Sequence, residues 1–154
     1  SKNGIVVAGI DDVSVRFSKC CNPVPGDEII GFVTRGRGVS IHRTDCINMM
    51  NLSEADRHRI IEPEWQVSSE GKDNELYDAE IIIYANDRMG LLLEITKVFT
   101  EMKIDVKSMN IRTSKQGIAT INVGFAIRGV EALHEVTKKV RQIEGIKDIQ
   151  RTQA

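Results

Sequence analysis

Three cysteines and one histidine stand at positions from which they could bind a single metal ion. Cys20 and Cys21 are adjacent, His42 lies in a later strand-like segment, and Cys46 follows His42 after three intervening residues. Three sulfurs and one imidazole would complete a tetrahedral structural zinc site. The spacing is not that of a CxxC finger. Both adjacent cysteines can reach one ion only if the chain turns there, which the following Asn-Pro-Val-Pro-Gly run favours.

The same residues fit other interpretations. Three buried thiols beside a surface histidine need no metal, and Asp45 could replace one cysteine as an oxygen ligand or orient His42. A Cys20 or Cys21 nucleophile with His42 as its base would make a thiol enzyme, but no third positioned group or oxyanion-hole motif accompanies the pair. Spacing alone leaves a zinc site and unliganded thiols as equal alternatives, and catalysis as a weak third.

Three arginines lie close to the candidate metal ligands. Arg35 and Arg37 alternate with glycines in an Arg-Gly-Arg-Gly run, and Arg43 follows the histidine. Guanidinium groups match phosphate oxygens and glycine permits close backbone approach, so a contact to a nucleic-acid backbone is physically reasonable. A solvated β-turn explains the same run, and charge alone favours that explanation.

The elements that must position these residues form a small mixed α/β unit, predicted over residues 1–66. Four short strands are predicted, at residues 5–8, 13–17, 29–34 and 39–42, the last two as a hairpin. Thr44 or Asp45 is predicted to cap a short helix, and Ser53 a second one. Residues 60–65 have the pattern of an edge strand closed by its proline.

A second unit is predicted over residues 76–154, after a polar and aperiodic linker at 67–75. Its order is strand, helix, strand, strand, helix, strand, at residues 79–85, 91–102, 104–113, 119–127, 133–143 and 146–151. The apolar alternation changes phase near Lys107 and Ser108, which predicts a β-bulge. This is the order of the split βαβ, ferredoxin-like topology, βαββαβ, with two helices on one face of an antiparallel sheet. The predicted fold class is α+β.

Length, composition and charge bound the function classes. A chain of 154 residues forms one ordinary domain or two small ones. A net charge of −1 argues against a surface that binds polyanions everywhere, although residues 53–80 are acidic and the flanking segments are not. Three cysteines cannot all pair, and neither a signal peptide nor a membrane-spanning run is apparent, which predicts a cytosolic protein without a membrane partner. The start without Met, directly in a strand-like run, predicts a fragment of a longer protein.

The cysteine run at residues 20–27, continued at 30–46, closely resembles the conserved-cysteine, or zinc-finger, domain of long RelA/SpoT homologues. These are the bacterial synthetases and hydrolases of the alarmone (p)ppGpp. The second unit looks like their C-terminal ACT domain, with residues 86–92 in the loop between its first strand and first helix. The resemblance implies a zinc site with the ligands Cys20, Cys21, His42 and Cys46.

The resemblance also implies a regulatory role. The family's hydrolase and synthetase domains lie N-terminal to this region, so the fragment is expected to have no catalytic residues and to act on catalytic domains of the same chain. Contacts to ribosomal RNA on stalled ribosomes are expected from Arg35, Arg37 and Arg43. Through them the chain would sense amino-acid starvation in the cytoplasm.

ACT domains resemble one another in binding small molecules, often amino acids, at dimer interfaces beside the first loop. The resemblance implies the ligand-binding positions Asn86, Asp87, Arg88, Met89, Gly90, Leu91 and Leu92. Helix N–H groups would favour a carboxylate, Asn86 or Asp87 an ammonium group, and the leucines a branched-chain side chain. A helix cap and core leucines explain the same residues. A homodimer through this domain is expected, and the alternative function is a ligand-gated dimerisation module that controls the catalytic half without binding RNA.

Overall fold

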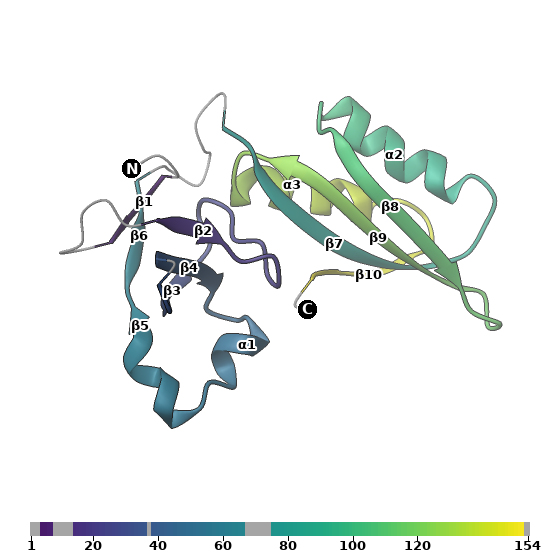
Figure 1. The fold of residues 1–154 in the computed structure, drawn as a ribbon. Helices are drawn as coiled ribbons and strands as arrows, with labels where there is room; N and C mark the ends of the chain where they lie inside the picture. The colour runs from purple at the N-terminus through teal and green to yellow at the C-terminus, as the bar shows by residue number, and fades with distance from the viewer. Residues whose placement is uncertain (1–3, 8–13, 37, 67–74, 153–154) are drawn as a thin grey trace.

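The computed structural model describes residues 4–7, 14–36, 38–66 and 75–152. Over these residues the chain forms two β-sheet units that contact each other, the first ending at Gln66 and the second beginning at Glu75 (Figure 1). The predicted α+β fold class is confirmed. Arg37 and residues 67–74 of the predicted linker lie outside the described residues. None of the described helices is both long and apolar enough to cross a lipid bilayer.

The first unit is built on a four-stranded sheet in the order β2-β4-β3-β5. Its strands are β2 (Val15–Phe17), β3 (Ile29–Thr34), β4 (Gly38–Arg43) and β5 (Ile60–Ile61). The predicted hairpin is β3–β4, whereas β2 pairs parallel with β4. A separate two-stranded sheet joins β1 (Ile5–Val7) to β6 (Pro63–Trp65). The predicted edge strand at 60–65 is therefore two strands that belong to different sheets.

Gly38 allows β2 to approach the strand that carries His42. Its φ is +95°, and a Cβ atom added there would lie 2.1 Å from the carbonyl oxygen of Ser14. That carbonyl accepts a hydrogen bond from the N–H of Val39 at 2.8 Å. A side chain at position 38 would collide with this backbone, so only glycine permits the close β2–β4 pairing.

Two short helical segments follow β4, α1 (Ile47–Met50) and the 3₁₀ helix η1 (Glu54–Arg59). The prediction that Thr44 or Asp45 caps the first was wrong, because the N-cap residue is Cys46 and the Asp45 carboxylate pairs with Arg43 instead. Ser53 does occupy the N-cap position of η1, although its hydroxyl bonds the Asp56 side chain and no backbone N–H.

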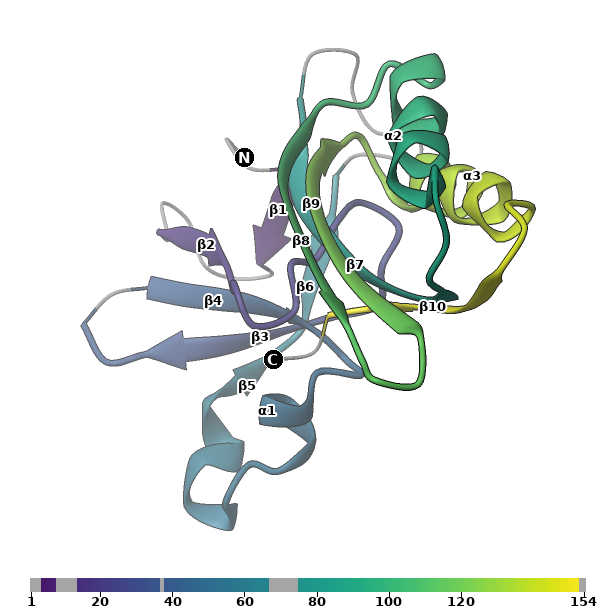
Figure 2. The same ribbon diagram turned by 90° about the vertical axis from the view of Figure 1, so that its right-hand side faces the viewer.

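The second unit has the predicted ferredoxin-like topology. Its sheet has the order β10-β7-β9-β8, with every neighbouring pair antiparallel. The elements are β7 (Tyr77–Asn86), α2 (Leu91–Glu101), β8 (Val106–Thr113), β9 (Ile118–Ile127), α3 (Val130–Arg141) and β10 (Ile146–Arg151). Figure 2 shows α2 and α3 on the same face of the sheet. The β8–β9 register shifts between Val106 and Ser108, so the predicted β-bulge is confirmed.

The main hydrophobic core lies between this sheet and its two helices. Alternate residues of β7 and β9 are buried and face α2 and α3, as period-2 strands with one covered face require. The largest fully buried side chains include Phe99 of α2 and Phe125 of β9, whose ring centroids lie 5.1 Å apart. The first unit has a smaller core of Ile5, Val7, Val39 and Ile41. With so few core residues, this unit gains from an additional cross-link.

Candidate metal centre

Cys20 and Cys21 lie in a tight turn that follows β2. The N–H of Asn22 donates a hydrogen bond to the carbonyl of Ser18 at 2.9 Å, and Asn22 adopts a left-handed φ of 48° that asparagine tolerates. An extended strand would point two adjacent side chains to opposite faces. Because the chain turns here, both cysteines reach the same site.

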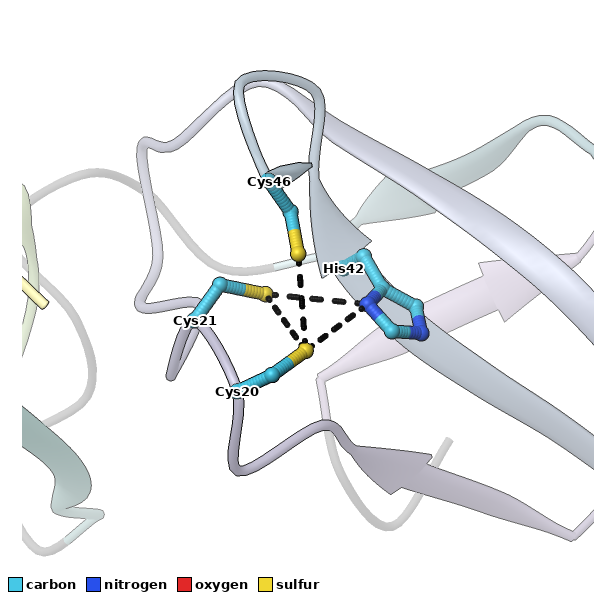
Figure 3. Close-up of side chains that lie close together, drawn as sticks. All are labelled: Cys20, Cys21, His42 and Cys46. Atoms are coloured by element: carbon cyan, nitrogen blue, oxygen red, sulfur yellow. Dashed lines mark hydrogen bonds between the residues drawn. The ribbon is translucent and has the colours of Figure 1, made fainter. Parts of the chain in front are cut away.

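The four candidate ligand atoms, three Sγ atoms and the Nδ1 of His42, lie within 4.8 Å of one another (Figure 3). Cys20 Sγ lies 3.3 Å from His42 Nδ1 and 3.4 Å from Cys46 Sγ. Cys21 Sγ lies 3.8 Å from the same nitrogen. In a tetrahedral site with Zn–S near 2.3 Å and Zn–N near 2.0 Å, ligand atoms are separated by about 3.5–3.8 Å. These three distances are close to the tetrahedral separations, so the cluster is compatible with a four-ligand zinc site.

The imidazole of His42 is held by its second nitrogen. Nε2 lies 3.2 Å from the hydroxyl of Ser40, which in turn donates to the carbonyl of Phe32 at 3.4 Å. This chain of bonds assigns the ring proton to Nε2 and leaves the lone pair of Nδ1 facing the sulfurs. Metal-binding histidines are usually oriented by such a hydrogen bond. The sequence contains the signal for this partner, because residues two apart in a strand share a face.

Arg43 holds Cys21 in place through both its backbone and its side chain. Its backbone N–H donates to Cys21 Sγ at 3.3 Å, and its guanidinium donates to the carbonyl of Cys21 at 3.0 Å. The same guanidinium forms two hydrogen bonds with the Asp45 carboxylate, the shorter at 2.8 Å. Arg43 is only 4% exposed. It is therefore engaged as an internal support, which argues against its predicted phosphate contact, and the paired Asp45 is not an oxygen ligand.

The environment of the cluster shifts the acid–base properties of its members. Burial lowers the pKa of His42 and the positive charge of Arg16 lowers it further, so the imidazole is neutral at pH 7, as a metal ligand must be. Burial raises the pKa of Cys21 and of Cys46. Burial also acts to raise the pKa of Cys20, but hydrogen bonds, chiefly from Ser18, outweigh it and lower that pKa.

Burial also bears on the interpretation as a thiol enzyme. Cys21 and Cys46 are 1% and 0% exposed, so a substrate could not reach them. Cys20 is the more accessible thiol, yet the base beside it, His42, is oriented by a serine hydroxyl and not by the carboxylate of a catalytic triad. The arrangement fits metal coordination better than nucleophilic attack.

The other predicted site residues lie apart from the cluster. Arg35 is exposed in the β3–β4 turn. In the second unit, Asn86 and Asp87 are exposed at the end of β7, and Gly90 is the N-cap residue of α2 with a φ of 81°. Neither the Asn86 nor the Asp87 side chain caps this helix.

The remaining loop residues divide into core and surface. Arg88 pairs with Glu94 and donates to the carbonyl of Glu144 at 3.1 Å. Met89 is 98% exposed, whereas Leu91 is 2% exposed and packs in the core. Leu91 is therefore occupied by packing, and among the predicted leucines only Leu92 retains an accessible apolar surface.

Comparisons with known proteins match both units separately. A model of the RelA/SpoT RIS domain matches residues 5–66, and a model of the ACT domain matches residues 73–151. The chain belongs to the RelA/SpoT family. Its RIS domain contains the four clustered metal-type ligands, and its ACT domain is the ferredoxin-like unit.

RelA/SpoT relatives match nearly the whole chain. It is 40% identical over 148 residues to a GTP pyrophosphokinase of Streptomyces coelicolor and 35% identical over 148 residues to one of Escherichia coli K12. Each match covers 96% of this chain but only 17% and 19% of the respective relative, so the chain spans under a fifth of their length. A solved ACT domain from the GTP pyrophosphokinase of Chlorobium tepidum is 23% identical, covering 50% of this chain and 99% of its own with a TM-score of 0.45.

Proposed function

We propose that this chain is a regulatory region of a (p)ppGpp synthetase/hydrolase and that its RIS domain is built around one structural zinc ion. The observation that carries the proposal is the convergence of Cys20, Cys21, His42 and Cys46 within 4.8 Å. Zinc bound there would cross-link the β2 turn to the β4–α1 segment. Because four protein ligands close the coordination shell, such a site serves stability and shape rather than catalysis.

Metal analysis tests the zinc site directly. Native mass spectrometry of the chain equilibrated with zinc should show one ion per chain, and His42→Ala should lose it. His58→Ala is the matched control, because His58 is exposed in η1 and outside the cluster. If His42→Ala retains zinc as tightly as His58→Ala, the ligand set is wrong.

The β3–β4 turn is the proposed contact to ribosomal RNA. Arg35 is exposed there, next to Gly36, and Arg37 follows in the sequence. The resemblance to ribosome-associated RelA/SpoT proteins supports this role. Arg43 is left out of the proposed contact, because its guanidinium bonds Asp45 and the carbonyl of Cys21.

Ribosome binding at several salt concentrations tests the RNA contact. Replacing Arg35 and Arg37 with Ala should weaken binding and reduce the salt slope by roughly one unit for each phosphate that is no longer neutralised. Arg128→Ala is the control, because Arg128 is an exposed arginine in a turn of the ACT domain. If the salt slope is unchanged in the double variant, ribosomal RNA binds at another part of the chain.

The first ACT loop is the proposed site for a branched-chain amino acid. Asp87 is exposed and suited to an ammonium group, and Leu92 offers an accessible apolar surface. Calorimetry with valine, leucine and isoleucine should give saturable heat that Asp87→Asn reduces. Asp105→Asn is the control, because Asp105 is an exposed carboxylate that pairs with Lys107. Absence of heat from all three amino acids would reject this ligand class.

Dimerisation without RNA binding is the second candidate function. Met89, which precedes α2, and Leu93, in its first turn, are 98% and 73% exposed, and a second chain could cover these apolar side chains. β8 also forms an edge of the ACT sheet, which a second chain could extend. Light scattering should show a dimer that Met89→Ser with Leu93→Ser dissociates. Leu76→Ser, at an exposed apolar position outside α2, should leave it intact.

A further inference from the structure

The segment at residues 20–27, named the docking loop, joins the candidate metal site to the ACT domain. It begins with the ligands Cys20 and Cys21, and Val24 at its centre is 0% exposed. Val24 is the one RIS-domain residue among the described buried members of the main core cluster, whose other members all belong to the ACT domain. The docking loop therefore begins in the metal site, and its centre lies inside the ACT core.

A backbone hydrogen bond also holds the docking loop against the ACT domain. The carbonyl of Pro25 accepts a hydrogen bond from the N–H of Val130 at 2.7 Å. Val130 is the first residue of α3, where helix N–H groups have no partner within the helix. The docking loop thus supplies an acceptor that the start of α3 lacks on its own.

An ion pair fixes the far end of the docking loop. Arg151, the last residue of β10, donates to the Asp27 carboxylate at 2.6 Å and to the carbonyl of Asn22 at 2.9 Å. The Asp27 side chain is 9% exposed, and its second oxygen accepts from the N–H of Val24 at 2.8 Å. Removing Arg151 would leave the nearly buried Asp27 carboxylate without its charged partner, which is costly for a buried charge.

A second contact between the domains is independent of the metal ligands. Phe17 and Trp65 of the RIS domain contact each other and Tyr77 of the ACT domain, with ring centroids 5.5–5.8 Å apart. The Trp65 indole N–H also donates to the carbonyl of Asp27 at 3.0 Å. The aromatic contact therefore joins the two domains and also holds the end of the docking loop.

The docking loop is too short and stiff for its ends to move independently. Pro23 and Pro25 restrict the backbone, and the N–H of Asp27 closes a turn on the carbonyl of Val24 at 3.0 Å. We infer that metal binding at Cys20 and Cys21 and seating of the docking loop on the ACT domain are coupled. The metal site thereby acts on α3 and β10, and a change at α3 or β10 acts on the metal site.

Thermodynamic linkage makes the coupling reciprocal. A metal ion that holds Cys20 and Cys21 favours the seated loop, and a seated loop holds the two cysteines ready for the ion. The inference rests on the zinc site proposed above and adds to it a route between the RIS and ACT domains.

Amide hydrogen exchange by NMR on the 154-residue chain tests the coupling. Removing zinc with a chelator should speed exchange of the Val130 N–H by about 5–150-fold, the usual range for coupled sites. The Leu133 N–H is the control, because it bonds the carbonyl of Gly129 within the ACT domain. In the same way Arg151→Ala should weaken zinc affinity. Arg112→Ala should not, because Arg112 is an exposed arginine of β8, at the opposite edge of the sheet from β10.

The outcomes separate the two proposals. Zinc bound at one ion per chain with equal Val130 exchange in the zinc-bound and zinc-free forms overturns the coupling and leaves the metal site standing. Absence of bound zinc in the same sample overturns the metal site and the coupling together. Faster Val130 exchange with constant Leu133 exchange, together with weaker zinc binding by Arg151→Ala, supports the inference.

Discussion

Removal of the Ser40 hydroxyl should weaken zinc binding although Ser40 is not a ligand. Ser40 is 5% exposed, and its hydroxyl is the described partner of His42 Nε2. In the zinc-free protein the imidazole can rotate or exchange its ring proton, so it tolerates the loss of this bond. Coordination through Nδ1 fixes the proton on Nε2 and leaves it without an acceptor in the Ser40→Ala variant. The loss therefore falls mainly on the zinc-bound state.

The expected magnitude follows from two independent estimates. Leaving a buried donor unsatisfied costs about 1–3 kcal/mol. Loss of a partner that orients a metal-binding histidine typically lowers metal affinity by about 10–100-fold. Since tenfold corresponds to about 1.4 kcal/mol, the two estimates agree. Ser40→Ala should bind zinc about 10–100-fold more weakly than the wild type.

Competition with a chromophoric chelator at neutral pH measures this affinity. Ser53→Ala is the control, because Ser53 is exposed and its hydroxyl bonds only the Asp56 side chain among the described groups. Circular dichroism establishes that both variants keep their secondary structure. If Ser40→Ala is folded and binds zinc as tightly as Ser53→Ala, the proposed orientation of His42 is refuted.

Three further predictions concern the ACT domain, and urea denaturation measures each. Leu91→Ala should lower the free energy of unfolding by about 2–5 kcal/mol because this side chain is in the core; equal loss in Leu93→Ala, at a 73% exposed position, would contradict the assignment. Gly90→Ala should cost about 1–2 kcal/mol through its left-handed φ alone, because an added Cβ meets no atom within 4 Å. Burial, with a smaller contribution from Glu75, raises the pKa of Tyr77 from 10.0 to about 12. The folded state then keeps a proton that the unfolded state releases, so stability is complete below pH 10 and falls as pH rises through about 12, a fall that Tyr77→Phe should reduce.

The local alternation of apolar and polar residues predicted the order of strands and helices in the second unit. The phase change at Lys107 and Ser108 located the bulge because each strand residue must face either the core or the solvent. Which strands pair with each other was harder to predict. Residues 60–65 have one strand pattern, yet β5 pairs with β3 and β6 with β1, because pairing depends on segments distant in sequence.

The candidate metal ligands were recognisable by residue type, and the turn needed to join Cys20 to Cys21 was indicated by the prolines that follow. The role of Arg43 was not recognisable from the sequence. Whether a guanidinium faces solvent or a buried carbonyl depends on where the Cys21 backbone lies after folding. The role of Asp27 could not be predicted from the sequence either, because its partner Arg151 comes 124 residues later.

That separation along the chain has a consequence for the order of assembly. The metal ligands all lie within residues 20–46, and the hairpin that presents His42 needs only β3 and β4. Bringing distant segments together costs more chain entropy than closing short loops. The RIS metal site can therefore form while later segments are still being synthesised. The ion pair of Asp27 must wait until β10 has joined β7, so the interface between the domains is completed last.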